Sequence, residues 1–207
     1  RTANALERLM DSGAFGAVGV TLVSDLLVIA NAENNLTEDG GNRITLVDRR
    51  TGSLRGTVEL ALGSPGFACP DYPVPFVSPH GPPQNRALLS RDPSFGCFPN
   101  PNGLALGVAE DGRRYVFTAN GGTDDVSVID LGAALSGSRT AEIRRLPAQV
   151  GPWGMTATPN GRHIIVSNGG SQRVARSGNS LSIYDTTRAA EGAAGAEVRE
   201  RDEELAR

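Results

Sequence analysis

Short apolar runs separated by polar turns dominate the hydrophobic pattern of this chain. The runs are rich in valine, isoleucine, leucine and threonine, and glycine, proline, asparagine and aspartate bound them; these are strand and turn signals respectively. The pattern therefore predicts an all-β protein. Three runs end in asparagine and three end in aspartate: 26–31, 115–120 and 164–168, then 43–48, 125–130 and 180–185.

The same order of elements repeats three times, over residues 13–60, 100–146 and 151–187. In each unit a glycine turn leads into a short apolar strand, a polar turn follows, and the strands ending in asparagine and aspartate come next. A fourth, more polar strand closes the first two units. Four short strands in a repeat of roughly 45 residues are typical of a propeller blade, which must stack on its neighbours to bury its faces.

These units resemble the YVTN family of β-propeller repeats, most closely over residues 100–187. The matching pieces are YVFTANGGTDDVSVID, GPWGMTATPNGR and IIVSNGGS…NSLSIYD. The resemblance implies an all-β propeller of four-stranded blades. Proteins that look like this are mostly surface or periplasmic, so it implies a periplasmic or extracellular location. Related propellers occur in lactonases and in redox enzymes, where the propeller holds a cofactor-bearing partner.

Three recognisable blades do not close a ring, since propellers typically have four to eight. We expect an incomplete ring, completed by a longer chain or by partner chains, and we favour the longer chain. Residues 1–12 predict a short helical lead-in, with Leu6, Leu9 and Met10 at helical spacing and Thr2 as its N-cap. Residues 188–207 form a polar Ala/Glu/Arg tail that could be a helix, an outer strand or a disordered segment.

Charge and hydropathy disfavour a nucleic-acid surface and a transmembrane segment in this chain. The net charge is −3, and the twenty basic residues, all arginine, are scattered apart from two doublets, so we expect no nucleic-acid surface. No apolar run approaches the ~18 residues that span a membrane. The chain begins with Arg1 rather than methionine, so a missing signal peptide says nothing about its location.

A proline-rich insertion at 61–99 separates the first two units. It holds both cysteines, and Cys69 and Cys97 are expected to form a disulfide in an oxidising compartment, the alternative being two unrelated thiols. Proline stiffens the segment and its aromatic residues can anchor a partner, although they could instead pack over the propeller itself. The predicted binding face comprises Phe67, Tyr72, Phe76, His80, Phe95 and Phe98, together with Trp153.

The long connections are predicted to crowd one face of the disc. In a four-stranded blade, the loop between strands two and three emerges on the same side as the connection to the next blade. The loops at 31–42 and 168–179 are long, and the insertion is itself a blade-to-blade connection. Loops on a rigid scaffold are where binding usually resides, so this face is the predicted binding face.

Few residues point to catalysis or metal binding. His80 and His163 lack neighbouring ligands at metal-binding spacing, so no metal site is predicted. The one weak candidate, for calcium, is a loop of oxygen donors without the alternation of an EF-hand, and a plain polar loop is the alternative. Its donors are Asn34, Asn35, Glu38 and Asp39.

Two recurring or prominent features have structural interpretations. Asp48, Asp130 and Asp185 recur at equivalent positions, which favours a role in turns. Trp153 stands at the entry to an inner strand, where its ring either packs between blades or lines the channel, and we favour packing.

The sequence thus predicts a non-catalytic binding or scaffolding propeller of an exported protein or larger complex, with protein partners and no cofactor. The alternative is the propeller portion of an enzyme, lactonase-like or a redox subunit, and a third interpretation is a structural surface-layer component. Inner strands of a propeller enzyme should carry carboxylates or histidines. The inner segments AVGV, LALGV and MTAT carry neither, which disfavours an enzyme.

Overall fold

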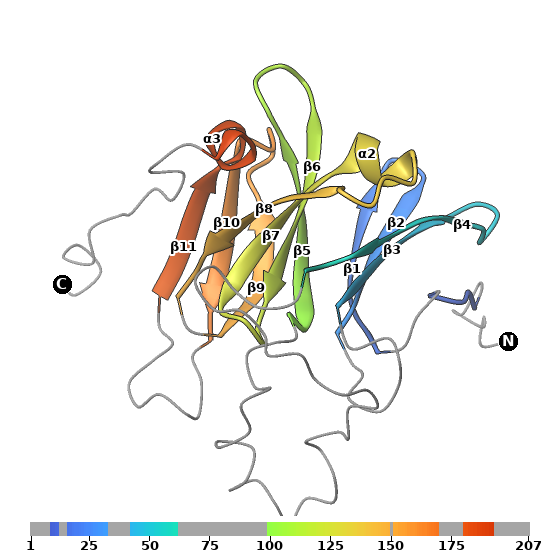
Figure 1. Cartoon of the computed structure of the whole chain (residues 1–207), viewed down its shortest axis with the longest axis horizontal. Coiled ribbons are helices and arrows are strands. Elements are labelled where there is room, and N and C mark those ends of the chain that lie inside the picture. The colour runs from blue at the N-terminus through green and yellow to red at the C-terminus, as the bar shows by residue number, and fades with distance from the viewer. Residues whose placement is uncertain are drawn as a thin grey trace, which may run out of the picture.

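The chain folds into three antiparallel sheets in the part that the computed structural model describes, residues 9–12, 16–32, 42–61, 99–149, 151–169 and 180–192. We call the sheets blades 1, 2 and 3 in chain order. Figure 1 shows them side by side, blade 1 in blue and teal, blade 2 in green and yellow, and blade 3 in orange and red.

Blades 1 and 2 are meanders of four strands, and blade 3 has three described strands. Short helices α2 and α3 follow the third strands of blades 2 and 3. The strands of blade 1 are β1 (Ala17–Val23), β2 (Leu26–Asn31), β3 (Arg43–Asp48) and β4 (Leu54–Glu59). Those of blade 2 are β5 (Pro101–Val108), β6 (Arg114–Asn120), β7 (Asp125–Asp130) and β8 (Glu142–Pro147), with α2 (Leu131–Leu135). Blade 3 contains β9 (Pro152–Ala157), β10 (His163–Asn168), β11 (Ser180–Asp185) and α3 (Thr186–Glu191).

Two hydrophobic cores hold the blades together, one at each blade-to-blade junction. Val28 and Ile44 of blade 1 pack with Val116 and Ile129 of blade 2. The opposite face of blade 2 packs on blade 3 through a second cluster that includes Phe117, Val128, Ile164 and Val166. Because blade 2 is covered on both faces, β6 and β7 are buried along almost their whole length.

The two end faces of the stack are open. On blade 1, alternate residues of β1 point away from blade 2, and Val18, Val20 and Leu22 are 54%, 64% and 56% exposed. On blade 3, Leu181 is 60% exposed on the face away from blade 2. Apolar sheet faces of this kind are covered by a further blade in a closed propeller. The prediction of an all-β, incomplete ring is confirmed.

The recurring asparagines and aspartates have structural roles. Buried Asn31, Asn120 and Asn168 each donate a hydrogen bond from Nδ2 to a hydroxyl of the next strand, at 3.2, 2.7 and 3.2 Å. Asp130 and Asp185 are the N-caps of α2 and α3. Asp48 accepts from the backbone N–H groups of residues 50 and 51, and these hydrogen bonds lower the pKa of its carboxyl group. The predicted role of the aspartates in turns is confirmed.

The two ends of the described chain differ in part from the sequence prediction. Leu9 to Ser12 carry no helix, and the rest of the predicted lead-in lies outside the described residues. The third unit continues past its last predicted strand into α3, which ends at Gly192 in a left-handed conformation. Neither described helix is long and apolar enough to cross a membrane.

Candidate binding site at the inner strands

Each blade starts its inner strand in the same way. The residue before the strand has a positive φ in all three blades: +65° at Gly16, +46° at Asn100 and +65° at Gly151. A triplet of variable residue, glycine and apolar residue follows: Val18–Val20 in β1, Asn102–Leu104 in β5 and Trp153–Met155 in β9.

The first residue of each triplet falls where the strand ladder is irregular. Val18, Asn102 and Trp153 have no partner in the registers of their strand pairs. Irregularities of this kind re-aim a side chain and are common beside functional sites.

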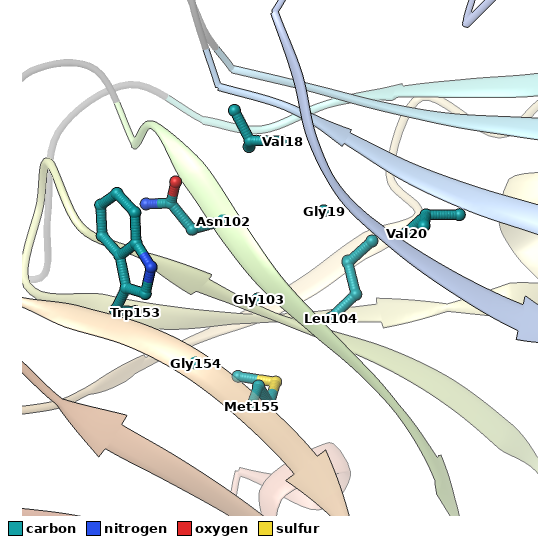
Figure 2. Close-up of a pocket in the computed structure, with 9 residues that line it drawn as sticks. All are labelled: Val18, Gly19, Val20, Asn102, Gly103, Leu104, Trp153, Gly154 and Met155. Atoms are coloured by element: carbon teal, nitrogen blue, oxygen red, sulfur yellow. The ribbon is translucent and has the colours of Figure 1, made fainter.

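The three triplets together line one cavity of about 300 Å³. Figure 2 shows the cavity between β1, β5 and β9, with Trp153 and Asn102 close together at one end and Leu104 and Met155 farther along. None of the nine lining residues is ionisable. Trp153 lines this cavity and is 65% exposed, which favours the channel-lining alternative over packing between blades.

The glycine of the triplet is required because the next blade approaches it through a backbone carbonyl. A Cβ on Gly19 would overlap the carbonyl oxygen of Asn102, and a Cβ on Gly103 would lie 2.5 Å from that of Trp153. Gly154 occupies the same place on blade 3, where the nearest atom outside its own strand is the Ser167 Oγ of the same blade, at 2.8 Å. Gly19 and Gly103 thus each accommodate a backbone carbonyl of the following blade, and we call this succession of inner strands the staircase arrangement.

Two of the lining side chains, those of Asn102 and Trp153, carry hydrogen-bonding groups. Asn102, 8% exposed, donates from Nδ2 to the carbonyl oxygen of Asn100 at 2.9 Å, while its Oδ1 accepts no hydrogen bond from the described residues. The indole N–H of Trp153 likewise has no acceptor among them. The described residues hold no group of three histidines, cysteines or carboxylates placed to bind a metal.

The long connections leave from the same edge as the cavity. They run from the ends of β2, β4 and β10 to the starts of β3, β5 and β11. These strand ends lie at the edge where β1, β5 and β9 begin, the lower edge in Figure 1, whereas α2 and α3 lie at the upper edge. We call the lower one the insertion-bearing edge and the upper one the hairpin edge. The prediction that the extensions leave from one face is confirmed for the residues at which they start and end.

A buried ionic network fixes the start of the insertion. Arg145 donates from Nη2 to the carbonyl oxygen of Ala61 at 2.7 Å, and Glu142 accepts from the Ala61 N–H at 2.6 Å. Arg145 also pairs with Asp125 at 3.1 Å and with Glu142 at 2.8 Å. Burial raises the pKa of the Asp125 carboxyl group even though Arg145 opposes that shift. At the other end of the insertion, the Pro99 carbonyl accepts from the Gly122 N–H at 2.9 Å.

The structure places one of the predicted binding residues, Trp153, at this cavity, and His163 at the hairpin edge where β10 begins. The remaining predicted residues lie outside the described part of the chain. They are the insertion residues Phe67, Tyr72, Phe76, His80, Phe95 and Phe98, the cysteines Cys69 and Cys97, and the calcium candidates Asn34, Asn35, Glu38 and Asp39.

Sequence reasoning missed Asn102 and Met155 as partners of Trp153. The repeat alignment does contain a signal for this site, because all three triplets keep the glycine while the residue before it differs from blade to blade.

Comparison with solved structures identifies the fold. No protein-family model matches the chain, and no curated protein matches its sequence. A chain of hydrazine synthase from Kuenenia stuttgartiensis matches 95% of this chain with a TM-score of 0.52 at 20% identity. U3-55K matches 93% with a TM-score of 0.51 at 9% identity, and the β-propeller domain of Cps50 (Swd1) from Myceliophteria thermophila matches 90% with a TM-score of 0.46 at 12% identity.

The chain is part of a β-propeller. It spans 38%, 41% and 39% of the hydrazine synthase, U3-55K and Swd1 chains, respectively. Identities this low show the fold alone. The narrower assignment to the YVTN family stays a prediction.

Proposed function

We propose that this chain is a non-catalytic binding or scaffolding part of a β-propeller that contacts a protein partner through its insertion-bearing edge. The observation that carries the proposal is the uncharged cavity at that edge, lined by one triplet from each blade. A concave site with an exposed indole and no charged side chain suits recognition, since aromatic side chains are enriched where protein surfaces meet.

The ionic network supports the same proposal. Arg145 and Glu142 hold both backbone groups of Ala61, the first residue of the insertion. A connection fixed at its start loses less conformational entropy when a partner binds, which favours affinity. A role for the insertion in contacting that partner is part of the proposal.

The alternative, a propeller that belongs to an enzyme, lacks support from the inner strands. The described residues of β1, β5 and β9 contain no acid, base or nucleophilic cysteine. Proton transfer at the cavity would therefore need an acid or base from other blades or from a partner. A redox role would similarly depend on a cofactor carried by the partner.

We further propose that the protein is exported and that Cys69 and Cys97 form a disulfide, since a cysteine pair in one long segment suits an oxidising compartment. Calcium binding by the loop of Asn34, Asn35, Glu38 and Asp39 is a weaker proposal that addition and chelation of Ca²⁺ would test.

Native mass spectrometry of the protein purified from its source, without reducing agent, tests the proposed function. We expect a complex of fixed stoichiometry between this protein and a different polypeptide. A particle that contains this polypeptide alone would contradict the proposal. A small organic or metal cofactor retained in the complex would contradict the non-catalytic interpretation and favour the redox alternative.

A further inference from the structure

The residue that opens each triplet varies while its surroundings do not. The positive φ before it, the irregular register at it and the glycine after it recur in all three blades. Features that recur in every blade have structural roles, as Asn120 does between strands and Asp130 does as a helix N-cap. The backbone accepts valine at position 18, asparagine at 102 and tryptophan at 153. Their identities are therefore not dictated by the fold.

Trp153 and Asn102 give this position a specific chemistry. The Trp153 ring lies over Gly121 of blade 2, where an added Cβ would come within 4.0 Å of Cε3 and 3.0 Å of the Asn102 Nδ2. Glycine at 121 thus leaves room for the indole to stand beside the amide. The indole N–H is a donor and Asn102 Oδ1 is an acceptor, and neither has a partner among the described residues.

The rest of the cavity is uncharged and combines the backbone of Gly19, Gly103 and Gly154 with apolar side chains. Leu104 and Met155 supply the apolar side chains that Figure 2 shows along it. A charged group placed there would find no counter-ion among the lining residues, which disfavours a charged ligand. An aromatic ring would gain contact with the indole and with the Met155 thioether, both favourable neighbours for a ring.

We propose that the cavity binds an uncharged aromatic side chain with a hydroxyl tip, a tyrosine, presented by a protein partner. This inference rests on the proposed function and specifies what the partner inserts. A phenolic hydroxyl both donates and accepts, so one group can serve Asn102 Oδ1 and the Trp153 N–H together. A volume of about 300 Å³ is at the small end for ligand sites and suits one side chain.

The two methionines of the chain provide a direct test. Met155 lines the cavity, whereas Met10 does not and serves as an internal control. We would label the methionine methyl groups of the full chain and titrate it with blocked Gly-Tyr-Gly, Gly-Phe-Gly, Gly-Glu-Gly and Gly-Lys-Gly peptides, and with glucose. The tyrosine peptide should shift the Met155 signal saturably and leave Met10 unchanged. The phenylalanine peptide lacks both hydrogen bonds of the hydroxyl and should bind about five- to a hundredfold more weakly.

Variants that copy blade 1 separate recognition from folding. Trp153→Val and Asn102→Val introduce the residue that blade 1 carries at the equivalent position, so the backbone should tolerate both. Each should weaken binding of the tyrosine peptide at least about threefold, whereas Leu54→Ala, on the exposed outer strand of blade 1, should not change it.

Several results would overturn the inference: no saturable Met155 shift, equal binding of the tyrosine and phenylalanine peptides, equal binding of a charged peptide, or a response to glucose alone. These outcomes are distinct from failure of the proposed function. A protein could bind at this edge without using a tyrosine, and native mass spectrometry would still detect that complex.

Discussion

Replacing Arg145 by methionine is expected to lower the free energy of unfolding by about 3–5 kcal/mol, the usual cost of removing one partner from a buried ion pair. The Arg145 side chain is 12% exposed, and the two carboxylates that it pairs with, Asp125 and Glu142, are 1% and 10% exposed. Methionine keeps most of the side-chain volume and removes the charge. Urea denaturation of the wild type and the variant measures the difference.

The effect of Arg145→Met should depend on pH. Burial already raises the pKa of Asp125 with Arg145 present, and loss of the arginine removes the charge that opposes this shift. The folded variant therefore takes up protons more readily than its unfolded state as the pH falls toward the ordinary aspartate pKa. The difference in free energy of unfolding between the wild type and Arg145→Met should therefore become smaller as the pH falls over that range.

Asp125→Asn is the matched control for the arginine variant. It leaves Arg145 paired with Glu142 and keeps an acceptor for Asn120 and Thr123, so we expect a loss of about 1–2 kcal/mol. Equal losses in the two variants, or a deficit for Arg145→Met that stays constant with pH, would show that the network does not contribute through its charges.

Replacing Gly103 by alanine is expected to destabilise the chain by about 3 kcal/mol, at the upper end of the usual cost of overpacking. The new Cβ would lie 2.5 Å from the Trp153 carbonyl oxygen and 2.8 Å from the Met155 nitrogen. Both are backbone atoms of a neighbouring inner strand, so relief requires blades 2 and 3 to separate. Thermal and urea unfolding measure this cost.

Gly154→Ala is the control, because the atom it approaches is the Ser167 hydroxyl, which can rotate away. In this chain alone we expect a loss below about 1 kcal/mol. In the complete propeller, a fourth blade should bring its carbonyl to Gly154 as Trp153 does to Gly103, and the same substitution should then cost as much as Gly103→Ala. Equal effects of the two substitutions in the isolated chain would contradict the staircase arrangement.

The repeat pattern was sufficient to predict the blades, because the strands depend on local alternation and on turn residues that the chain repeats. Asp130 and Asp185 were correctly given structural roles at strand ends, yet α2 was missed, and a helix was only one of three alternatives for the segment that contains the end of α3. Runs of five and six residues give too little periodicity to distinguish a helical turn from a loop.

Residues that meet across blades could not be predicted from spacing. Arg145 and Ala61 are 84 positions apart, and their hydrogen bond exists because β8 of blade 2 lies beside the end of β4. The cavity likewise combines three triplets from different blades. Trp153 was recognised because tryptophan is conspicuous, whereas Asn102 gains its importance from its neighbours in space.

Hydrogen–deuterium exchange of the native complex, compared with the isolated chain, tests the central claim most directly. Segments 121–124 and 151–155 report on the insertion-bearing edge, and the turns at 49–53, 109–113 and 158–162 report on the hairpin edge. If the insertion-bearing edge binds the partner, exchange in the complex should slow in the first set and remain unchanged in the second. Protection confined to the hairpin edge, or no protection at either edge, would contradict the account.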